Sequence, residues 1–297
     1  MSKCQKCKRK KLKKKLKVGV LLVGGSLKGI YGHTGVMSAI KEFDCQGLEV
    51  KVILGASAGS VIGAFYAANL STYSIYKKML SLRAKDFIDL LPKIEFFYRL
   101  IICKGRHFFG FIRGKMLGKY MEKQLEGKND FDKMTTPLYI SGVNLDTYKL
   151  VLFNTGVISD KVRASTAVPI LFQPQKIDGS NYIDGAIKRI KLPYMLLKRH
   201  PELDVIIISN FIHEATQVES NYLENTTLPL LEITRRILSM QETTEWPTKI
   251  GKTKIVNIYP KGLRSVDFFN PSREAAREIF RGSKTFAINK IKKAFKL

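Results

Sequence analysis

Two short runs of aliphatic residues dominate the first part of the chain, and each leads into a turn of small residues and then a helical pattern. Val18–Val23 precedes a glycine-rich turn and a helical pattern from about Ile30 to Phe43. Val50–Leu54 precedes a second small-residue turn and the apolar helical pattern at 60–70. Buried strands that alternate with helices form parallel sheets covered by helices. The sequence therefore predicts an α/β fold.

Later segments extend this pattern. The region 73–130 is mostly helical in pattern, and the end of the chain has the pattern of a basic amphipathic helix at 271–297. No linker long enough to divide the body is present, and no run of eighteen apolar residues predicts a membrane-spanning helix. Further strands are expected at Leu138–Val143, Leu150–Phe153, Val205–Ser209 and Ile255–Ile258.

The charge of the chain restricts its partners. It has 51 Lys and Arg against 25 Asp and Glu, a net charge of +26. Such an excess predicts a polyanionic partner, either an anionic membrane surface or a nucleic acid. Residues 1–17 contain ten Lys or Arg and no acid, which predicts a disordered basic tail that is either solvated or docked on anionic lipid headgroups. No recognisable nucleic-acid-binding motif accompanies the charge, so nucleic acid is the less favoured partner.

The second turn has the pattern G-x-S-x-G, with Gly55, Ser57 and Gly59 at its fixed positions. This pattern is typical of a nucleophile elbow, in which a serine lies on a sharp strand-to-helix turn between residues without bulky side chains. The N-terminus of the following helix favours an anionic intermediate at that point. The pattern also occurs in ordinary tight turns, but its strand-and-helix context favours Ser57 as a nucleophile.

The first turn, Gly24–Gly29, is a candidate oxyanion hole. Acyl transfer creates an oxyanion that needs N–H donors already in place. Loops that follow neighbouring parallel strands emerge at the same edge of the sheet, so this turn is expected beside Ser57. A nucleotide-phosphate loop is the alternative. However, Ser26 replaces the middle glycine of the dinucleotide fingerprint, and Gly29 follows Lys28 where a P-loop needs Ser or Thr.

A serine nucleophile also needs a base. Among the four histidines, only His213 has the order and placement that a Ser–acid–His triad requires. Asp184 is the other candidate, because it ends a short apolar segment and small residues follow it. A partly desolvated aspartate can take the proton of a serine hydroxyl directly. An Asp-Gly pair is also a common turn, so the residues alone leave both bases open.

Together these motifs resemble the patatin-like phospholipase family over about residues 18–210. The resemblance rests on three motifs in order, Gly24–Gly29, Gly55–Gly59 and Asp184–Ala186. The segment Ala164–Pro169 is similar to a fourth, A-S-x-A-x-P. The resemblance implies a three-layer α/β/α fold with a mainly parallel central sheet. It makes 18–210 the catalytic domain and 211–297 an extension packed on the same domain.

The resemblance also implies the chemistry. Ser57 would be the nucleophile and Asp184 the general base of a lipid acyl hydrolase of the phospholipase A or lysophospholipase type. It would act through an acyl-serine intermediate, without a metal or other cofactor. Ser26 departs from the family, which commonly has glycine there, and a positive φ would be strained for serine. The implied oxyanion hole is Gly24, Gly25, Ser26, Lys28 and Gly29, the elbow glycines are Gly55 and Gly59, and the residues after the base are Gly185 and Ala186.

Two segments predict contact with an anionic membrane. Residues 86–113 interleave aromatic side chains with Lys and Arg, as at membrane interfaces, although the rings also suit a core. The final helix carries eight cations against Glu274 and Glu278. We therefore expect a cytoplasmic protein in peripheral contact with membranes. The alternatives are a catalytically weak lipid-binding relative, an acyltransferase and a basic nucleic-acid-binding module.

Overall fold

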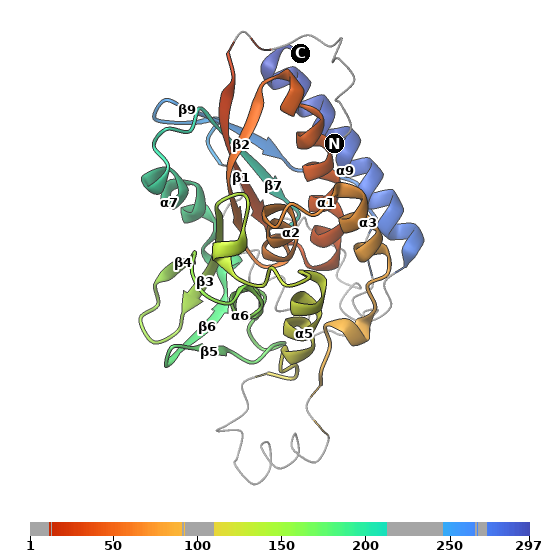
Figure 1. Cartoon of the computed structure of the whole chain (residues 1–297), viewed down its shortest axis with the longest axis vertical. Coiled ribbons are helices and arrows are strands. Elements are labelled where there is room, and N and C mark those ends of the chain that lie inside the picture. The colour runs from red at the N-terminus through yellow and green to blue at the C-terminus, as the bar shows by residue number, and fades with distance from the viewer. Residues whose placement is uncertain are drawn as a thin grey trace, which may run out of the picture.

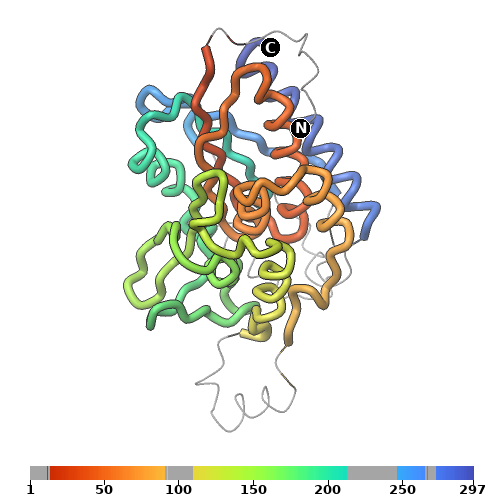
Figure 2. Tube along the Cα trace, viewed as in Figure 1, coloured from red at the N-terminus to blue at the C-terminus, as the bar shows by residue number. Residues whose placement is uncertain are grey.

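The computed structural model describes residues 12, 14–90, 92, 110–212, 246–264, 266 and 272–297. Within this part of the chain, nine strands form one sheet in the order β5-β6-β3-β2-β1-β7-β9-β8, with β4 paired to β3. Figure 1 shows helices on both faces of the sheet, and Figure 2 traces the same path as a tube.

The middle of the sheet is parallel. Its five strands pair side by side in one direction, while the remaining strands pair antiparallel at the margins. The parallel strands are rich in aliphatic residues because helices cover both faces. They are β1 (Leu16–Val23), β2 (Leu48–Gly55), β3 (Leu138–Asn144), β7 (Val205–Asn210) and β9 (Thr253–Ile258). The antiparallel strands are β4 (Leu150–Phe153), β5 (Gln175–Ile177), β6 (Ser180–Asp184) and β8 (Lys249–Ile250).

Two hydrophobic layers lie on opposite faces of this sheet. Val20 and Leu22 of β1 belong to the larger core, with α1, α2, α3, α5 and α9, whereas Leu21 faces the smaller core with α7. The helices are α1 (Ser26–Glu42), α2 (Ala58–Ala67), α3 (Thr72–Leu80), α5 (Lys115–Gln124), α6 (Ile158–Ser165), α7 (Leu192–Arg199) and α9 (Arg273–Phe295). This alternation confirms the three-layer α/β/α class.

The C-terminal segments belong to the same body. β9 pairs with β7, and α9 lies along α1 (Figure 1). The contact is close, because a Cβ atom on Gly35 of α1 would lie 2.4 Å from the carbonyl oxygen of Phe280. The Phe280 ring also packs on Tyr76 of α3, with ring centroids 4.4 Å apart. None of the helices among the described residues has the length and apolarity needed to cross a bilayer.

The expected boundary of the basic tail needs adjustment. β1 begins at Leu16, inside the predicted 1–17 tail, because Leu16 pairs with Leu48 and the Lys17 N–H donates to Asp204 over 2.8 Å. Residues 1–11 and 13 lie outside the described part of the chain. So does most of the aromatic and cationic segment at 86–113, namely 91 and 93–109. Between α3 and α5 the described residues include a 3₁₀ turn at Ala84–Asp86.

Candidate active site

Ser57 lies on a strained turn between β2 and α2. Its backbone angles are φ 53° and ψ −127°, a combination that non-glycine residues rarely adopt. The turn leaves no room for larger neighbours, because a Cβ atom on Gly59 would lie 2.0 Å from the Leu22 carbonyl oxygen. One on Gly55 would lie 2.5 Å from the Cα atom of Ser60. The glycines of G-x-S-x-G therefore allow strand and helix to meet at this angle.

Asp184 ends β6 and lies beside the serine. The Ser57 side chain is close enough to this carboxylate to lower its pKa, and the Ala186 N–H donates to Oδ1 over 2.7 Å. The carboxylate is buried, with only 3% of the residue exposed. Gly185 is required here, because a Cβ atom would lie 2.2 Å from the Ser141 hydroxyl. Residues 127 positions apart in the sequence thus meet at this site.

Burial controls the protonation of Asp184. Desolvation raises the pKa of this carboxyl to about 7, while the Ser57 side chain, the Ala186 N–H and the positive charge of Arg189 each act to lower it. Arg189 is itself buried, with 1% of its surface exposed. A carboxyl with a pKa near neutrality is suited to accept a proton and return it, as a general base must.

The glycine-rich turn after β1 lies against the serine. A Cβ atom on Gly24 would approach the Ser57 Cβ to 3.2 Å and the Ala186 Cβ to 3.4 Å. Gly25 has φ 128°, and a Cβ atom there would lie 2.4 Å from the Cβ of Phe211. Ser26 has φ 53°, so the strain expected for serine at this position is present in the backbone.

In the expected oxyanion hole, the Lys28 side chain and the Gly29 amide have other partners. The Lys28 amine donates to the Leu263 carbonyl over 2.8 Å and ties the turn to the segment before α9. The Gly29 N–H donates to the Gly25 carbonyl over 2.7 Å as part of α1. Gly29 serves packing instead, because a Cβ atom there would lie 2.9 Å from the Gly24 carbonyl oxygen. The amides of Ser26 and Leu27, at the start of α1, have no acceptor within the helix.

The histidines have different surroundings. His33 is buried in α1, its Nδ1 lies 2.8 Å from the Ser209 hydroxyl, and desolvation lowers its pKa to about 4. His200 contacts Glu202 and the Tyr139 hydroxyl. His107 and His213 lie outside the described residues, and His213 is the histidine that the sequence offered as a triad base. Among the described residues, Asp184 is the carboxyl whose pKa the Ser57 side chain lowers.

Two further residues touch this site. The Ser57 N–H donates to the Ser165 hydroxyl over 2.9 Å, and Arg189 lies within electrostatic reach of Asp184. Ser165 falls in the A-S-x-A-x-P segment, so the sequence pointed to this residue but did not indicate what it does. No sequence pattern pointed to Arg189, because it lies in a basic stretch of the kind usually found on a solvated surface.

Comparison with known proteins gives a consistent result. Residues 20–197 match the family model described as patatin-like phospholipase. The chain is 26% identical over 168 residues to the protein named lysophospholipase NTE1 of Meyerozyma guilliermondii, covering 57% of this chain and 11% of that protein. It is 27% identical over 173 residues to an uncharacterized NTE family protein of Mycobacterium bovis, covering 58% and 43%. The match thus spans about a tenth of the yeast relative and less than half of the mycobacterial one.

The fold has a solved counterpart. The crystal structure of VipD from Legionella pneumophila superposes with a TM-score of 0.51 at 14% identity, covering 99% of this chain and 72% of that one. The similarity supports the architecture alone. Since the family model covers more than half of the 297 residues and contains both Ser57 and Asp184, the chain belongs to the patatin-like phospholipase family.

Proposed function

We propose that the protein is a lipid acyl hydrolase that cleaves carboxylic esters of membrane lipids, with Ser57 as nucleophile and Asp184 as general base. The observation that carries the proposal is a serine on a strained turn, Ser57, next to a buried carboxyl, Asp184, whose pKa burial raises to about 7. Family membership supports the reaction class. The name lysophospholipase, borne by several relatives, supports a phospholipid or lysophospholipid substrate.

The reaction runs in two stages. Asp184 takes the hydroxyl proton as Ser57 Oγ attacks the ester carbonyl, and the C=O electron pair moves onto oxygen. Collapse of this intermediate breaks the ester C–O bond, and Asp184 returns the proton to the leaving alcohol or lysolipid. Water then attacks the acyl-serine with Asp184 again as base, releasing the fatty acid and restoring the hydroxyl.

The oxyanion needs preorganised N–H donors. α2 begins at Ala58, so the Ala58 N–H has no acceptor within its helix and lies next to the nucleophile. The amides of the Gly25–Leu27 turn at the start of α1 are the second source. Both helices also direct the positive ends of their dipoles at this region. The Ser57 N–H is engaged by Ser165 and is not assigned this role.

Active-site labelling tests the proposal. A fluorophosphonate probe should label the full-length protein at one serine, identified as Ser57 by peptide mass spectrometry. Ser57→Ala should abolish labelling, and Asp184→Asn should slow labelling and ester hydrolysis by about a hundredfold or more, as expected for loss of a general base. Ser81→Ala is the control, because the Ser81 hydroxyl donates to the Lys78 carbonyl over 2.9 Å and touches neither Ser57 nor Asp184. A folded protein that is not labelled would contradict the proposal.

The strained Ser26 supports a second candidate, a catalytically weak lipid-binding relative. A misplaced oxyanion donor in the Gly25–Leu27 turn would lower the rate while leaving the Ser57–Asp184 pair intact. Transfer to a lipid hydroxyl instead of water uses the same acyl-serine. Product analysis with an added lysolipid acceptor distinguishes transfer from hydrolysis.

A further inference from the structure

One short buried segment contacts the backbones of both proposed catalytic residues. The Ser165 hydroxyl, at the end of α6, accepts the Ser57 N–H over 2.9 Å. Two residues later, the Ala167 carbonyl accepts the Asp184 N–H over 3.0 Å. Ser165 and Ala167 have no solvent exposure. The nucleophile and the base are thus held by neighbouring points on the same stretch of chain.

These contacts act on main-chain groups and therefore on where each residue sits. Ser57 is held at φ 53° and ψ −127°, a conformation that persists only if its surroundings fix it. Without the Ser165 hydroxyl, its buried N–H would lose its acceptor, and relaxation of the turn would be favoured. Relaxation would move the Ser57 hydroxyl relative to Asp184, and small displacements of reacting groups cost rate steeply.

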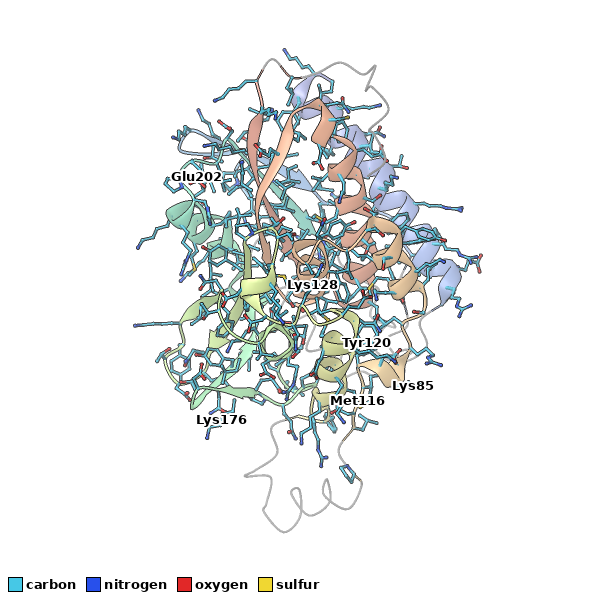
Figure 3. The ribbon with its side chains drawn as sticks, in the orientation of Figure 1. Lys85, Met116, Tyr120, Lys128, Lys176 and Glu202 are labelled. Atoms are coloured by element: carbon cyan, nitrogen blue, oxygen red, sulfur yellow. The ribbon has the colours of Figure 1, made fainter. Side chains whose placement is uncertain are left out.

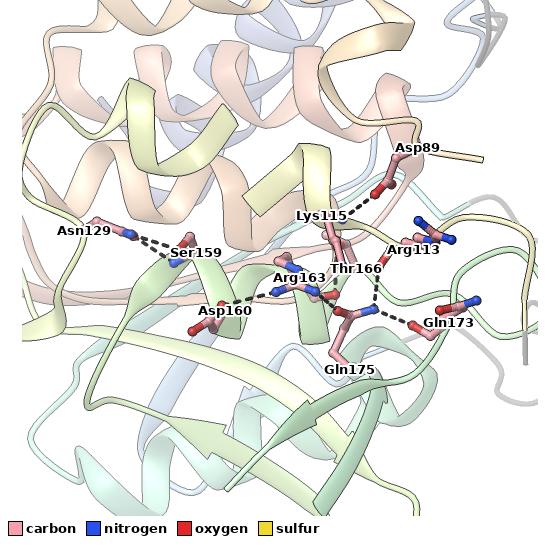
Figure 4. A network of polar contacts seen from close by, with 10 residues as sticks. All are labelled: Asp89, Arg113, Lys115, Asn129, Ser159, Asp160, Arg163, Thr166, Gln173 and Gln175. Atoms are coloured by element: carbon pink, nitrogen blue, oxygen red, sulfur yellow. Dashed lines mark hydrogen bonds and ion pairs between the residues drawn. The ribbon is translucent and has the colours of Figure 1, made fainter. Parts of the chain in front are cut away.

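The segment is itself anchored. At the start of α6, the Asn129 amide donates to the Ser159 hydroxyl over 2.9 Å and accepts the Ser159 N–H over 2.8 Å (Figure 4). Further along, Arg163 bonds to Asp160 over 3.3 Å and to Gln175. Figure 4 shows this network along α6 and its neighbouring strands. A helix fixed in this way provides a rigid point of attachment for Ser165.

We infer that Ser165 is a positioning residue: its hydroxyl holds the strained backbone of Ser57, and the Ser165–Ala167 segment sets the separation between Ser57 and Asp184. This inference rests on the proposed function for its kinetic consequence, but its structural part stands without it. It explains why a hydroxyl is buried at the end of α6, in contact with a backbone amide from another part of the chain.

Ser165→Ala tests the inference. The variant should lower kcat and the fluorophosphonate labelling rate by about tenfold or more, with KM changed by less than about threefold. Ser165→Cys, of similar size but with a weaker acceptor, should fall between wild type and Ser165→Ala. If Ser165→Ala does not fold, Ser165→Cys is the variant that tests the inference.

Thr166→Val is the matched control. The Thr166 hydroxyl bonds to the Val162 and Arg163 carbonyls within its own helix, so its loss disturbs the segment without touching the Ser57 or Asp184 backbone. Equal losses of kcat in Thr166→Val and Ser165→Ala would overturn the inference, because they would show a general effect of loosening α6. Wild-type labelling rates in folded Ser165→Ala and Ser165→Cys would overturn it as well.

A structural readout separates this inference from the proposed function. In protein labelled with ¹⁵N-serine, the Ser57 amide should exchange with solvent at least tenfold faster in Ser165→Ala than in wild type and Thr166→Val. Suppose that the Ser57 amide exchanges faster in Ser165→Ala, but that the wild type neither reacts with the fluorophosphonate nor hydrolyses esters. That result would support the contact and refute the proposed function. Unchanged exchange would refute the positioning role even if the wild type is an active hydrolase.

Discussion

At the scale of single residues, the protonation of Asp184 sets the pH range in which Ser57 can be activated. The carboxyl must be ionised to accept the serine proton, and burial raises its pKa to about 7. We therefore expect kcat/KM to rise with pH through about 7, to level off above it, and to fall about tenfold per pH unit below it. A pH–rate profile with a soluble ester measures this. A profile flat from pH 5 to 8 would contradict a carboxylate base of this pKa.

Arg189 gives this profile a residue-specific test. Its positive charge lowers the pKa of Asp184, so Arg189→Met should move the midpoint of the kcat/KM profile to higher pH. Lys188→Met is the control, because the neighbouring Lys188 amine bonds to the Tyr148 carbonyl and does not act on Asp184. Equal shifts in both variants would indicate an effect of net charge alone.

Ser26 offers a test of backbone strain. A non-glycine residue at φ 53° costs about 1 kcal/mol, which glycine avoids. Ser26→Gly should therefore raise the free energy of unfolding by up to about 1 kcal/mol in urea titrations, with kcat changed less than about threefold. A tenfold gain in kcat would instead favour the catalytically weak candidate, since it would show that serine misplaces the oxyanion donors.

At the scale of elements, the sequence predicts those strands that consist of a run of hydrophobic residues. β1, β2, β3, β4, β7 and β9 were expected from such runs, and each expected end lies within two residues of the observed one. α6 and α7 were not predicted, because eight residues of mixed polarity carry little periodic signal. The motif residues could be identified from the sequence because each motif is a pattern of neighbouring residues. Ser165 and Arg189 acquire their surroundings only when distant segments meet, so no local pattern defined their roles.

The contact between α1 and α9 supplies a test at this scale. Because a Cβ atom on Gly35 would meet the Phe280 backbone, Gly35→Ala should destabilise the fold by about 1–3 kcal/mol. Gly63→Ala in α2 is the matched control, since its Cβ would come no closer than 3.2 Å, to a side-chain methyl of Ile53. Its cost should be smaller, as alanine favours helix by about 1 kcal/mol. A single unfolding transition in urea would show that α9 unfolds together with the rest of the domain. Two transitions would show that α9 unfolds separately from it.

At the scale of the whole molecule, the cations on α9 lie along an outer edge. Figure 3 shows side chains projecting from this helix away from the sheet, whereas Lys176 is labelled at the opposite lower corner. The exposed cations of α9 and of its C-cap are Arg273, Arg277, Arg281, Lys290, Lys292, Lys293 and Lys296. Each Lys or Arg near an anionic bilayer contributes about 1 kcal/mol of attraction. The α9 face is therefore the proposed membrane contact among the described residues.

Charge reversal distinguishes this face from net charge. Arg277→Glu, Arg281→Glu and Lys293→Glu together should weaken binding to phosphatidylglycerol-containing vesicles by more than about tenfold, and leave hydrolysis of a soluble ester unchanged. The matched control reverses Lys149, Lys176 and Lys252, which are exposed outside α9 and change the net charge by the same amount. Vesicle sedimentation measures binding. Equal weakening in both triple variants would refute a specific α9 contact, because it would show that the charge of +26 acts as a whole.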